Sequence, residues 1–287
     1  MRKLSEPIRD LKAFFDLDCE GSSLLGGICV ASYAEQLILK REDAVMKAAV
    51  SFVHADYNAD APLDREVFHS DECSYFESLV FHRRKSNFVL GRLSAKQAVS
   101  VLLSEPNLRN VSVETGVFGQ PMLRINGVHS YQVSIAHCDY IGAAVVFPEA
   151  HPMGIDIERI DSKRNKTIES QLTTEEKERI SVVRGVGEYS ALLTVFWTVK
   201  EALSKILRTG FTTSLHVLEM NETRLVDGYF QSTFSHFPQY AAQSYQLGDY
   251  ICTIVAPRKT EWSMNTSRIY EKFNTIFHRN PFVGHAY

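Results

Sequence analysis

The sequence has little of what marks a secreted or membrane-spanning protein. Its five cysteines are odd in number, scattered and without a Cys-x-x-Cys pair, which argues against both a disulfide framework and a zinc site. The longest apolar run near the N-terminus, Leu24 to Ala31, is about a third of the length of a membrane span. Acidic residues precede this run, so neither a transmembrane helix nor a signal peptide fits. We therefore expect a cytoplasmic protein without membrane contact.

The sequence also lacks a strong excess of charge. The formal net charge is −3 over 287 residues, so no global field draws the protein to nucleic acid, and an anionic ligand must meet a local basic patch. With 45% hydrophobic and 23% charged residues, the composition is that of an ordered globular protein with one large core or two modest ones. We expect a monomer that does not bind nucleic acid.

Two carboxylates stand out on a predicted strand in the second half of the chain. Ile155 and Ile157 alternate with Asp156 and Glu158, which is the period-two pattern of a half-buried strand and puts both carboxylates on one face. Residues two apart on a strand face lie about 7 Å apart, close enough to share one hard cation. The ordinary alternative is a solvated sheet face.

A third carboxylate lies on a predicted helix some forty residues later. Its apolar positions at helical spacing are Phe196, Val199, Leu203 and Ile206. Trp197, Glu201 and Lys205 then fall together on a neighbouring face. Alone, Glu201 and Lys205 would be read as a surface pair worth about 0.3–0.5 kcal/mol.

Together the two segments resemble a known paired signature. Gly-Ile-Asp-Ile-Glu at 154–158 and Trp-x-x-Lys-Glu-Ala-x-x-Lys at 197–205 are similar to the signature of the 4'-phosphopantetheinyl transferase superfamily. The resemblance extends over about 66–256 and is strongest from 134 to 205. It implies an α+β fold of two similar α/β lobes related by pseudo-twofold symmetry, each an antiparallel sheet packed on a long helix, with the active site between them. The sequence itself shows no residue-level internal repeat.

The predicted lobes meet at a proline-flanked connector, 148–152. We expect an N-terminal lobe at 1–150, a C-terminal lobe at 151–257 and an extension at 258–287.

The resemblance implies an enzyme, a holo-[acyl-carrier-protein] synthase or 4'-phosphopantetheinyl transferase. Such enzymes move the 4'-phosphopantetheine arm of coenzyme A to a serine of an apo acyl or peptidyl carrier protein and release adenosine 3',5'-bisphosphate. Asp156, Glu158 and Glu201 would hold Mg²⁺, the ion that this phosphoryl chemistry needs. Lys205 and Lys200 would supply further positive charge at the coenzyme A phosphates, and Glu201 is the candidate base for the serine proton.

The same resemblance assigns coenzyme A contacts in the first lobe. The long helix expected from Leu79 to Leu103 carries basic residues: Arg83, the strongest candidate, then Arg84, Lys85 and Arg92. Arginine forks suit a doubly charged phosphate, although a run of cations on a helix is often only a solvated face. His137 follows a predicted strand at the position where the family's histidine contacts the pyrophosphate.

Two departures from the family pattern affect the predicted coenzyme A site. Gln120 stands where the family has the lysine of Gly-Lys-Pro, so it can offer hydrogen bonds but no charge. Ala136 and Cys138 replace two serines of the Ser-x-Ser-His-Ser turn.

Two functions from other classes remain open. One is a different Mg²⁺-dependent phosphoryl enzyme, such as a hydrolase, that uses the same carboxylates. The other is a non-catalytic relative that binds coenzyme A or a carrier protein. The full set of signature carboxylates and lysines argues against the second, and the sequence does not identify the carrier.

Further elements are predicted from local patterns. They are an amphipathic helix at 5–15, a hairpin at 111–125 with turns at 119–121 and 126–127, a helix from a capping box at 173–176, a glycine cap at 210, strands at 215–220, 225–234, 242–247 and 250–255, and a helical pattern at 269–277.

Overall fold

The computed structural model describes residues 23–25, 28–56, 62–105, 107–125, 130–183 and 187–274. The helix expected at 5–15 and the turn expected at 126–127 lie outside these residues. Within the described ranges no helix is long and apolar enough to cross a membrane.

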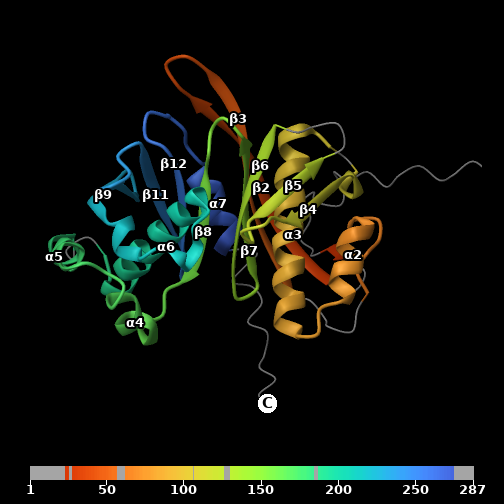
Figure 1. Cartoon of the computed structure of the whole chain (residues 1–287), viewed down its shortest axis with the longest axis horizontal. Coiled ribbons are helices and arrows are strands. Elements are labelled where there is room, and N and C mark those ends of the chain that lie inside the picture. The colour runs from red at the N-terminus through yellow and green to blue at the C-terminus, as the bar shows by residue number, and fades with distance from the viewer. Residues whose placement is uncertain are drawn as a thin grey trace, which may run out of the picture.

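Two five-stranded antiparallel sheets form the centre of the molecule (Figure 1). The strands of the first, in spatial order, are β1 (Ser23–Leu25), β2 (Ile28–Lys40), β3 (Val45–Asp56), β7 (Ile141–Pro148) and β6 (Tyr131–Cys138). Those of the second are β8 (Gly154–Arg159), β12 (Tyr250–Pro257), β11 (Tyr240–Leu247), β10 (Tyr229–Phe234) and β9 (Met220–Val226). A separate hairpin is made by β4 (Val111–Thr115) and β5 (Pro121–Ile125).

Except for the last, the helices lie on the outer faces of the sheets or beyond them (Figure 1). The described α-helices are α2 (Ser70–Glu77), α3 (His82–Leu103), α4 (Asn165–Glu169), α5 (Thr174–Val183), α6 (Tyr189–Leu207) and α7 (Thr266–Lys272). Short 3₁₀ turns are η1 (Leu108–Asn110), η2 (Ser162–Arg164), η3 (Gly210–Thr212) and η4 (Leu215–Leu218).

The sheets are buried on both faces, because they pack against each other on the inside and against a long helix on the outside. On β7, Val145 belongs to the inner core with Ile155 and Ile254 of the second sheet, whereas Val146 packs outward with Val99 of α3. The same division holds for β12, whose Val255 packs on α6. Double-sided burial explains why these strands read as continuous apolar runs.

The C-terminal helix α7 completes the inner core. Ile269 and Phe273 are buried among residues of both sheets, and the rings of Phe273 and Phe52 meet edge to face with centroids 5.3 Å apart. Through residue 273, the predicted extension thus packs between the two sheets and not on the surface of one lobe.

The two halves repeat one order of elements. In each, a strand is followed by helices and then by two antiparallel hairpins, with β3, β7 and β6 neighbours in one sheet and β8, β12 and β11 neighbours in the other. In the β6–β7 hairpin a tyrosine pairs with a proline, Tyr131 with Pro148, and in the β11–β12 hairpin Tyr240 pairs with Pro257. The expected α+β architecture is confirmed, and the pseudo-twofold relation between the lobes stays a prediction.

Local signals were of unequal value. The capping box before α5 is confirmed, since the Thr173 N–H donates to Glu176 Oε2 (2.9 Å) and the Glu176 N–H donates to Thr173 Oγ1 (3.1 Å). The strand predicted at 215–220 is wrong: 215–218 is a 3₁₀ turn whose preceding Ser214 accepts a hydrogen bond from the His216 N–H. The glycine cap predicted for α6 is also wrong, because Arg208 takes the left-handed conformation at its end (φ 55°).

Other patterns were confirmed with shifted limits. The run 225–234 is two strands that turn at Asp227 and Gly228, where φ is 48° and 86°. The hairpin at 111–125, the long helix before it and the strands at 242–247 and 250–255 are present.

Gly154 lets β8 lie directly against α6. A Cβ atom at this position would stand 2.1 Å from the carbonyl oxygen of Ala202 and 3.0 Å from a side-chain atom of Ile206. The first distance is too short for any real Cβ atom and involves backbone that cannot rotate away, whereas the second is tight and would require Ile206 to shift. Glycine is therefore required where the strand that carries Asp156 meets the helix that carries Glu201.

We predict that Gly154→Ala lowers the free energy of unfolding by about 3 kcal/mol, the upper part of the range for overpacking. Gly187→Ala is the matched control, since its added methyl would meet its nearest atoms at 3.6 Å and should cost less than about 0.5 kcal/mol. Urea unfolding of both variants measures the difference. Equal losses would show that the approach of β8 to α6 is not tight.

Candidate functional site

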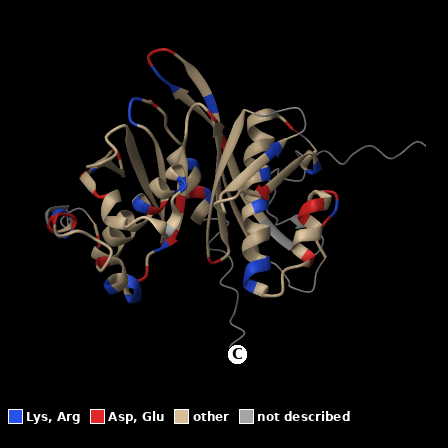
Figure 2. Cartoon of the chain, viewed as in Figure 1, with Lys and Arg blue, Asp and Glu red and all other residues tan. Residues whose placement is uncertain are grey.

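The strand and helix signatures meet at the junction of β8 and α6. Lys205 Nζ donates to Asp156 Oδ1 (2.9 Å) and to the carbonyl oxygen of Ile155 (2.8 Å). Figure 2 shows basic and acidic residues side by side where α6 lies against β8. Asp156 is buried, and the Lys205 side chain is 27% exposed. An ammonium group has three protons, so one N–H of Lys205 remains for a ligand.

Two buried carboxylate oxygens at this junction have no hydrogen-bond partner, namely Asp156 Oδ2 and Glu201 Oε1. Buried acceptors without a donor are rare and need an explanation. One comes from the strand and one from the helix. Hard oxygen donors left open in this way are what a divalent cation such as Mg²⁺ requires, so these residues fit the predicted metal.

The electrostatics of the two acids agree with this interpretation. Burial, reinforced by the charge of Asp156, raises the pKa of Glu201 to about 7. Burial also raises the pKa of Asp156, although the Lys205 ammonium opposes the rise. The single lysine does not compensate the buried Asp156 and the half-buried Glu201, and a further cation would lower both pKa values.

The third predicted ligand, Glu158, is already engaged by other donors. Arg164 Nη1 lies 2.6 Å from its Oε2, and the indole N–H of Trp197 donates to its Oε1 over 3.3 Å. The Cys138 thiol donates weakly to Oε2 over 3.6 Å. Among the described residues, no three His, Cys, Asp or Glu side chains converge as a metal-binding group. Two of the three predicted ligands thus have an open oxygen, and Glu158 holds Arg164.

The structure contradicts the coenzyme A contact predicted for Lys200. Its side chain is fully buried, its ammonium lies 2.7 Å from Glu176 Oε2, and it donates to the carbonyl oxygen of Leu215 (2.8 Å). All of these partners belong to the second lobe behind α6. Adjacent positions on a helix point about 100° apart. Lys200 and Glu201 therefore point to different sides of α6.

A cleft of about 350 Å³ on the first lobe gathers several of the predicted phosphate contacts. It is lined by Arg84, Arg92 and His137, together with residues of the β4–β5 hairpin. Arg92 stacks over the Phe88 ring at 4.2 Å and donates to the Val113 carbonyl (3.0 Å), while its buried Nε has no partner. Arg92 therefore has one N–H fixed and another open.

Arg83 and His137 differ from the sequence expectation in detail. Arg83 is exposed and does not line this cleft, although its charge acts on His137. Although His137 is exposed by surface area, desolvation by the surrounding protein, with the charge of Lys205, lowers its pKa and favours the neutral imidazole. A neutral ring still donates one hydrogen bond to a phosphate oxygen.

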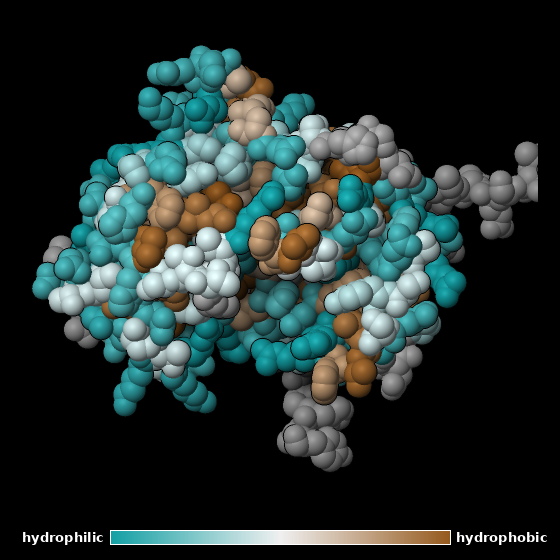
Figure 3. All heavy atoms as spheres, viewed as in Figure 1, coloured by the Kyte–Doolittle hydropathy of each residue, from teal (hydrophilic) through white to brown (hydrophobic). Residues whose placement is uncertain are grey.

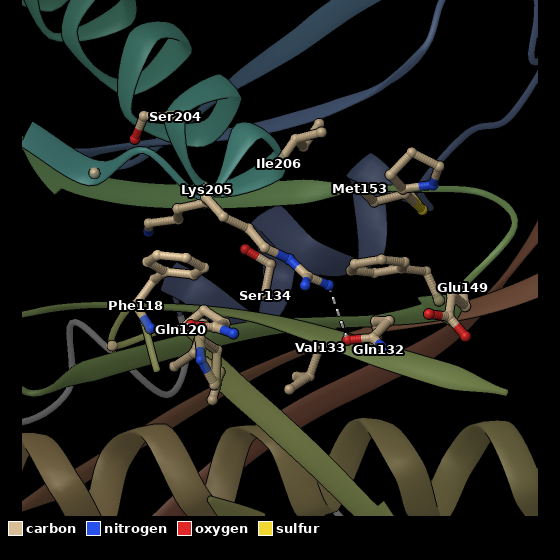
Figure 4. A pocket seen from close by; sticks show the side chains of 17 residues that line it. Phe118, Gln120, Gln132, Val133, Ser134, Glu149, Met153, Ser204, Lys205 and Ile206 are labelled. Carbon is tan, nitrogen blue, oxygen red and sulfur yellow. Dashed lines mark hydrogen bonds between the residues drawn. The ribbon is translucent and has the colours of Figure 1, made fainter. Parts of the chain in front are cut away.

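A second cleft of about 320 Å³ lies between the hairpin tip and the end of α6. Figure 4 shows Lys205 and Phe118 extending toward each other across it from opposite sides. Arg208 contributes a guanidinium whose Nη2 donates to Gln132 Oε1 at 3.5 Å. Both clefts include Gly119, Pro121 and Ile135, so they adjoin at the hairpin tip.

The side chain of Gln120 stabilises the tip of the β4–β5 hairpin. Its Oε1 accepts from the Phe118 N–H (3.0 Å), and its amide covers Gly116, where a Cβ would stand 2.3 Å from Nε2. The side chain is thus folded back over its own turn, in place of the charged contact that the family's lysine makes.

Sequence patterns missed Arg164 and Ser134. Arg164 lies in the turn after β8, and no periodicity points to it. Ser134 Oγ accepts from the Ile155 N–H over 3.1 Å and joins β6 of the first sheet to β8 of the second. Only its place in the Ser-x-Ser-His-Ser pattern could have drawn attention to it.

The comparisons with known proteins support the resemblance. A family model described as ACPS, 4'-phosphopantetheinyl transferase superfamily, matches residues 152–255. The matched segment begins just before β8 and includes α6, and therefore contains both halves of the carboxylate site. A search of curated proteins gives no significant match.

The raised pKa of Glu201 makes a stability prediction for the metal-free protein. Its pKa is about 7 when folded against 4.5 for the ordinary group, so its stabilising contribution is complete below about pH 4.5 and is lost as the pH rises through about 7. Gln cannot ionise. Above that window Glu201→Gln should be more stable than wild type by roughly 1–2 kcal/mol, a value reduced for partial exposure.

Urea unfolding with a chelator at about pH 5 and about pH 8 measures this difference. Glu222→Gln, at an exposed position on β9, is the control and should show no such trend. An advantage of Glu201→Gln that does not grow with pH would contradict the raised pKa.

Proposed function

We propose that this chain is a member of the 4'-phosphopantetheinyl transferase superfamily, whose family model matches residues 152–255, and that it transfers the 4'-phosphopantetheine arm of coenzyme A to a serine of an apo acyl or peptidyl carrier protein, releasing adenosine 3',5'-bisphosphate. The observation that carries the proposal is the pair of buried, unpartnered oxygens on Asp156 and Glu201. They come from the two signature segments and lie next to a lysine that faces a cleft.

Asp156 and Glu201 would hold Mg²⁺ through these oxygens. When bound, the ion neutralises charge that grows on the pyrophosphate and keeps the reacting phosphate in line. Lys205 is tied to Asp156 and to the Ile155 backbone, so its remaining N–H is held in position for a phosphate oxygen at no cost in side-chain freedom.

Glu201 is the best-placed group to accept the proton of the carrier serine. A general base works best when its pKa lies near the working pH, and burial raises that of Glu201 to about 7. The value of about 7 is that of the metal-free site, and bound Mg²⁺ would lower it. Glu201 would then take the serine proton directly or through a water beside it.

Glu158 has a supporting role in the proposed mechanism. Its two oxygens hold Arg164 and the Trp197 indole, which keeps a guanidinium at the edge of the carboxylate site. Glu158 would join the ion as a third ligand only by giving up one of these hydrogen bonds.

The first-lobe cleft is the proposed site for the coenzyme A phosphates. Arg84, Arg92 and His137 line it, and the open Nε of Arg92 provides a buried donor without a partner. Guanidinium groups give charge-assisted hydrogen bonds to phosphate oxygens. Arg83, at the exposed side of the same helix, would reach a phosphate only at the outer edge of the cleft.

The two rival functions differ in product. A hydrolase with the same carboxylates would consume coenzyme A without a carrier protein, and a non-catalytic relative would bind without consuming it. The open oxygens at Asp156 and Glu201 favour a metal-dependent reaction over binding alone.

Incubation with coenzyme A, Mg²⁺ and a panel of apo carrier proteins tests the proposal, with mass spectrometry to detect the added arm. The panel should include carriers of fatty-acid, polyketide, nonribosomal-peptide and lysine synthesis. We expect transfer by the wild type and none by Asp156→Ala, because loss of one open oxygen leaves too few hard ligands for the ion. Glu222→Ala is the control with an exposed carboxylate removed. Transfer that persists in Asp156→Ala or in excess chelator would refute the metal site.

Coenzyme A titration by calorimetry tests the first-lobe cleft. His137→Ala should weaken binding by about 1.5–3 kcal/mol, the value of one hydrogen bond to a charged group. His216→Ala removes an exposed imidazole on η4 and should leave the affinity unchanged. Equal affinity of both variants would place the phosphates elsewhere.

A further inference from the structure

A buried ion pair anchors α6 on the side away from the clefts. Lys200 and Glu176 are both fully buried, with 2.7 Å between Nζ and Oε2. Lys200 also donates to the carbonyl oxygen of Leu215. Glu176 caps α5 through the Thr173 N–H, and its Oε1 accepts from the Met220 N–H (3.0 Å) at the start of β9. One pair thus joins α5, α6, η4 and β9.

The first lobe contains the same arrangement. Glu72 and Lys96 are buried with 2.8 Å between Oε2 and Nζ. Glu72 caps α2 through the His69 N–H and accepts from the Val113 N–H of β4 (3.1 Å). Lys96 donates to the carbonyl oxygens of Leu108 and Val111. The glutamate precedes the lysine by the same number of residues in both lobes, 72 to 96 and 176 to 200.

This correspondence is a residue-level repeat that the sequence did not show. Each ion pair links three elements of its lobe: the start of a shorter helix, the long helix and the first strand of a hairpin. Burial lowers the pKa of both lysines, and the paired glutamate in each lobe opposes the shift. The two ammonium groups therefore occupy equivalent environments.

The residue after each lysine differs between the lobes. In the first lobe it is Gln97, a neutral residue whose amide N–H donates to Ser32 Oγ (2.6 Å) and whose buried Oε1 also has no partner. In the second lobe it is Glu201, whose Oε1 has no partner. The buried Glu–Lys pair is the same in both lobes. Only in the second lobe is the residue after the lysine ionisable.

We infer that Lys200 is a positioning residue: its ion pair with Glu176 fixes the rotation of α6 that keeps the open oxygen of Glu201 beside Asp156. The apolar contacts of α6 are non-directional, so they hold the helix against the sheet without orienting a particular polar group. A buried ammonium held by a carboxylate and a carbonyl has a defined geometry. This inference rests on the proposed function, because it assumes that Glu201 and Asp156 share a divalent ion.

Mn²⁺ binding, measured without coenzyme A by electron paramagnetic resonance, tests the inference apart from activity. Mn²⁺ takes the same oxygen ligands as Mg²⁺. Lys200→Met is compared with Lys96→Met, its structural counterpart. Both should lower the melting temperature, because each leaves a buried carboxylate unpaired. Only Lys200→Met should weaken Mn²⁺ binding, by about tenfold, as loss of a residue that orients a ligand does.

Glu176→Gln and Glu72→Gln form a second matched pair that keeps the side-chain shape, and they decide the question if a lysine variant does not fold. The same contrast is expected between them. The inference is overturned if the second-lobe variants bind Mn²⁺ as wild type does, or if the first-lobe variants weaken it equally. Failure of the wild type itself to bind Mn²⁺ would instead contradict the proposed metal site and, with it, the site that Lys200 positions.

Discussion

The candidate site depends on one constraint, two carboxylates that lie close together at the junction of β8 and α6. Asp156 and Glu201 come from a strand and a helix that touch at Gly154. Lys205 donates a hydrogen bond to Asp156, and its charge also acts on Glu201. Burial of two like charges is costly unless a cation compensates them. The rise in the pKa of Glu201 to about 7 and the two unpartnered oxygens both follow from this burial.

The rest of the fold holds these groups in place from several directions. The inner core of the two sheets fixes β8 from behind through Ile155 and Ile157, and the Ser134 hydroxyl joins it to the first sheet. The buried Lys200 pair secures α6 from the far side. The clefts then adjoin this rigid junction at the hairpin tip, where Val117 and Phe118 are exposed. On the face seen in Figure 3, hydrophobic residues form separate patches in a mostly hydrophilic surface.

Periodicity predicted the elements that carry the site, because β8 and α6 each have one apolar face with strong spacing. Periodicity could not predict which polar side chains of α6 are buried against other elements and which face the cleft. Lys200 and Lys205 are both signature lysines, yet one is buried with Glu176 and the other faces the cleft. Arg164 was missed because a turn residue has no pattern. The short apolar run 215–218 resembled a strand, and the serine before it sets a 3₁₀ turn instead. Residues that meet only through tertiary packing, such as Glu72 and Lys96, are invisible to local patterns.

The central claim is that Asp156 and Glu201 hold one divalent ion at the pyrophosphate of coenzyme A. Electron–nuclear double resonance on Mn²⁺ bound to the protein with coenzyme A tests it most directly, because ³¹P coupling reports a phosphate oxygen on the ion. The account predicts strong ³¹P coupling in the wild type and its loss in Asp156→Ala. Bound Mn²⁺ without ³¹P coupling, or coupling that survives in Asp156→Ala, would contradict it.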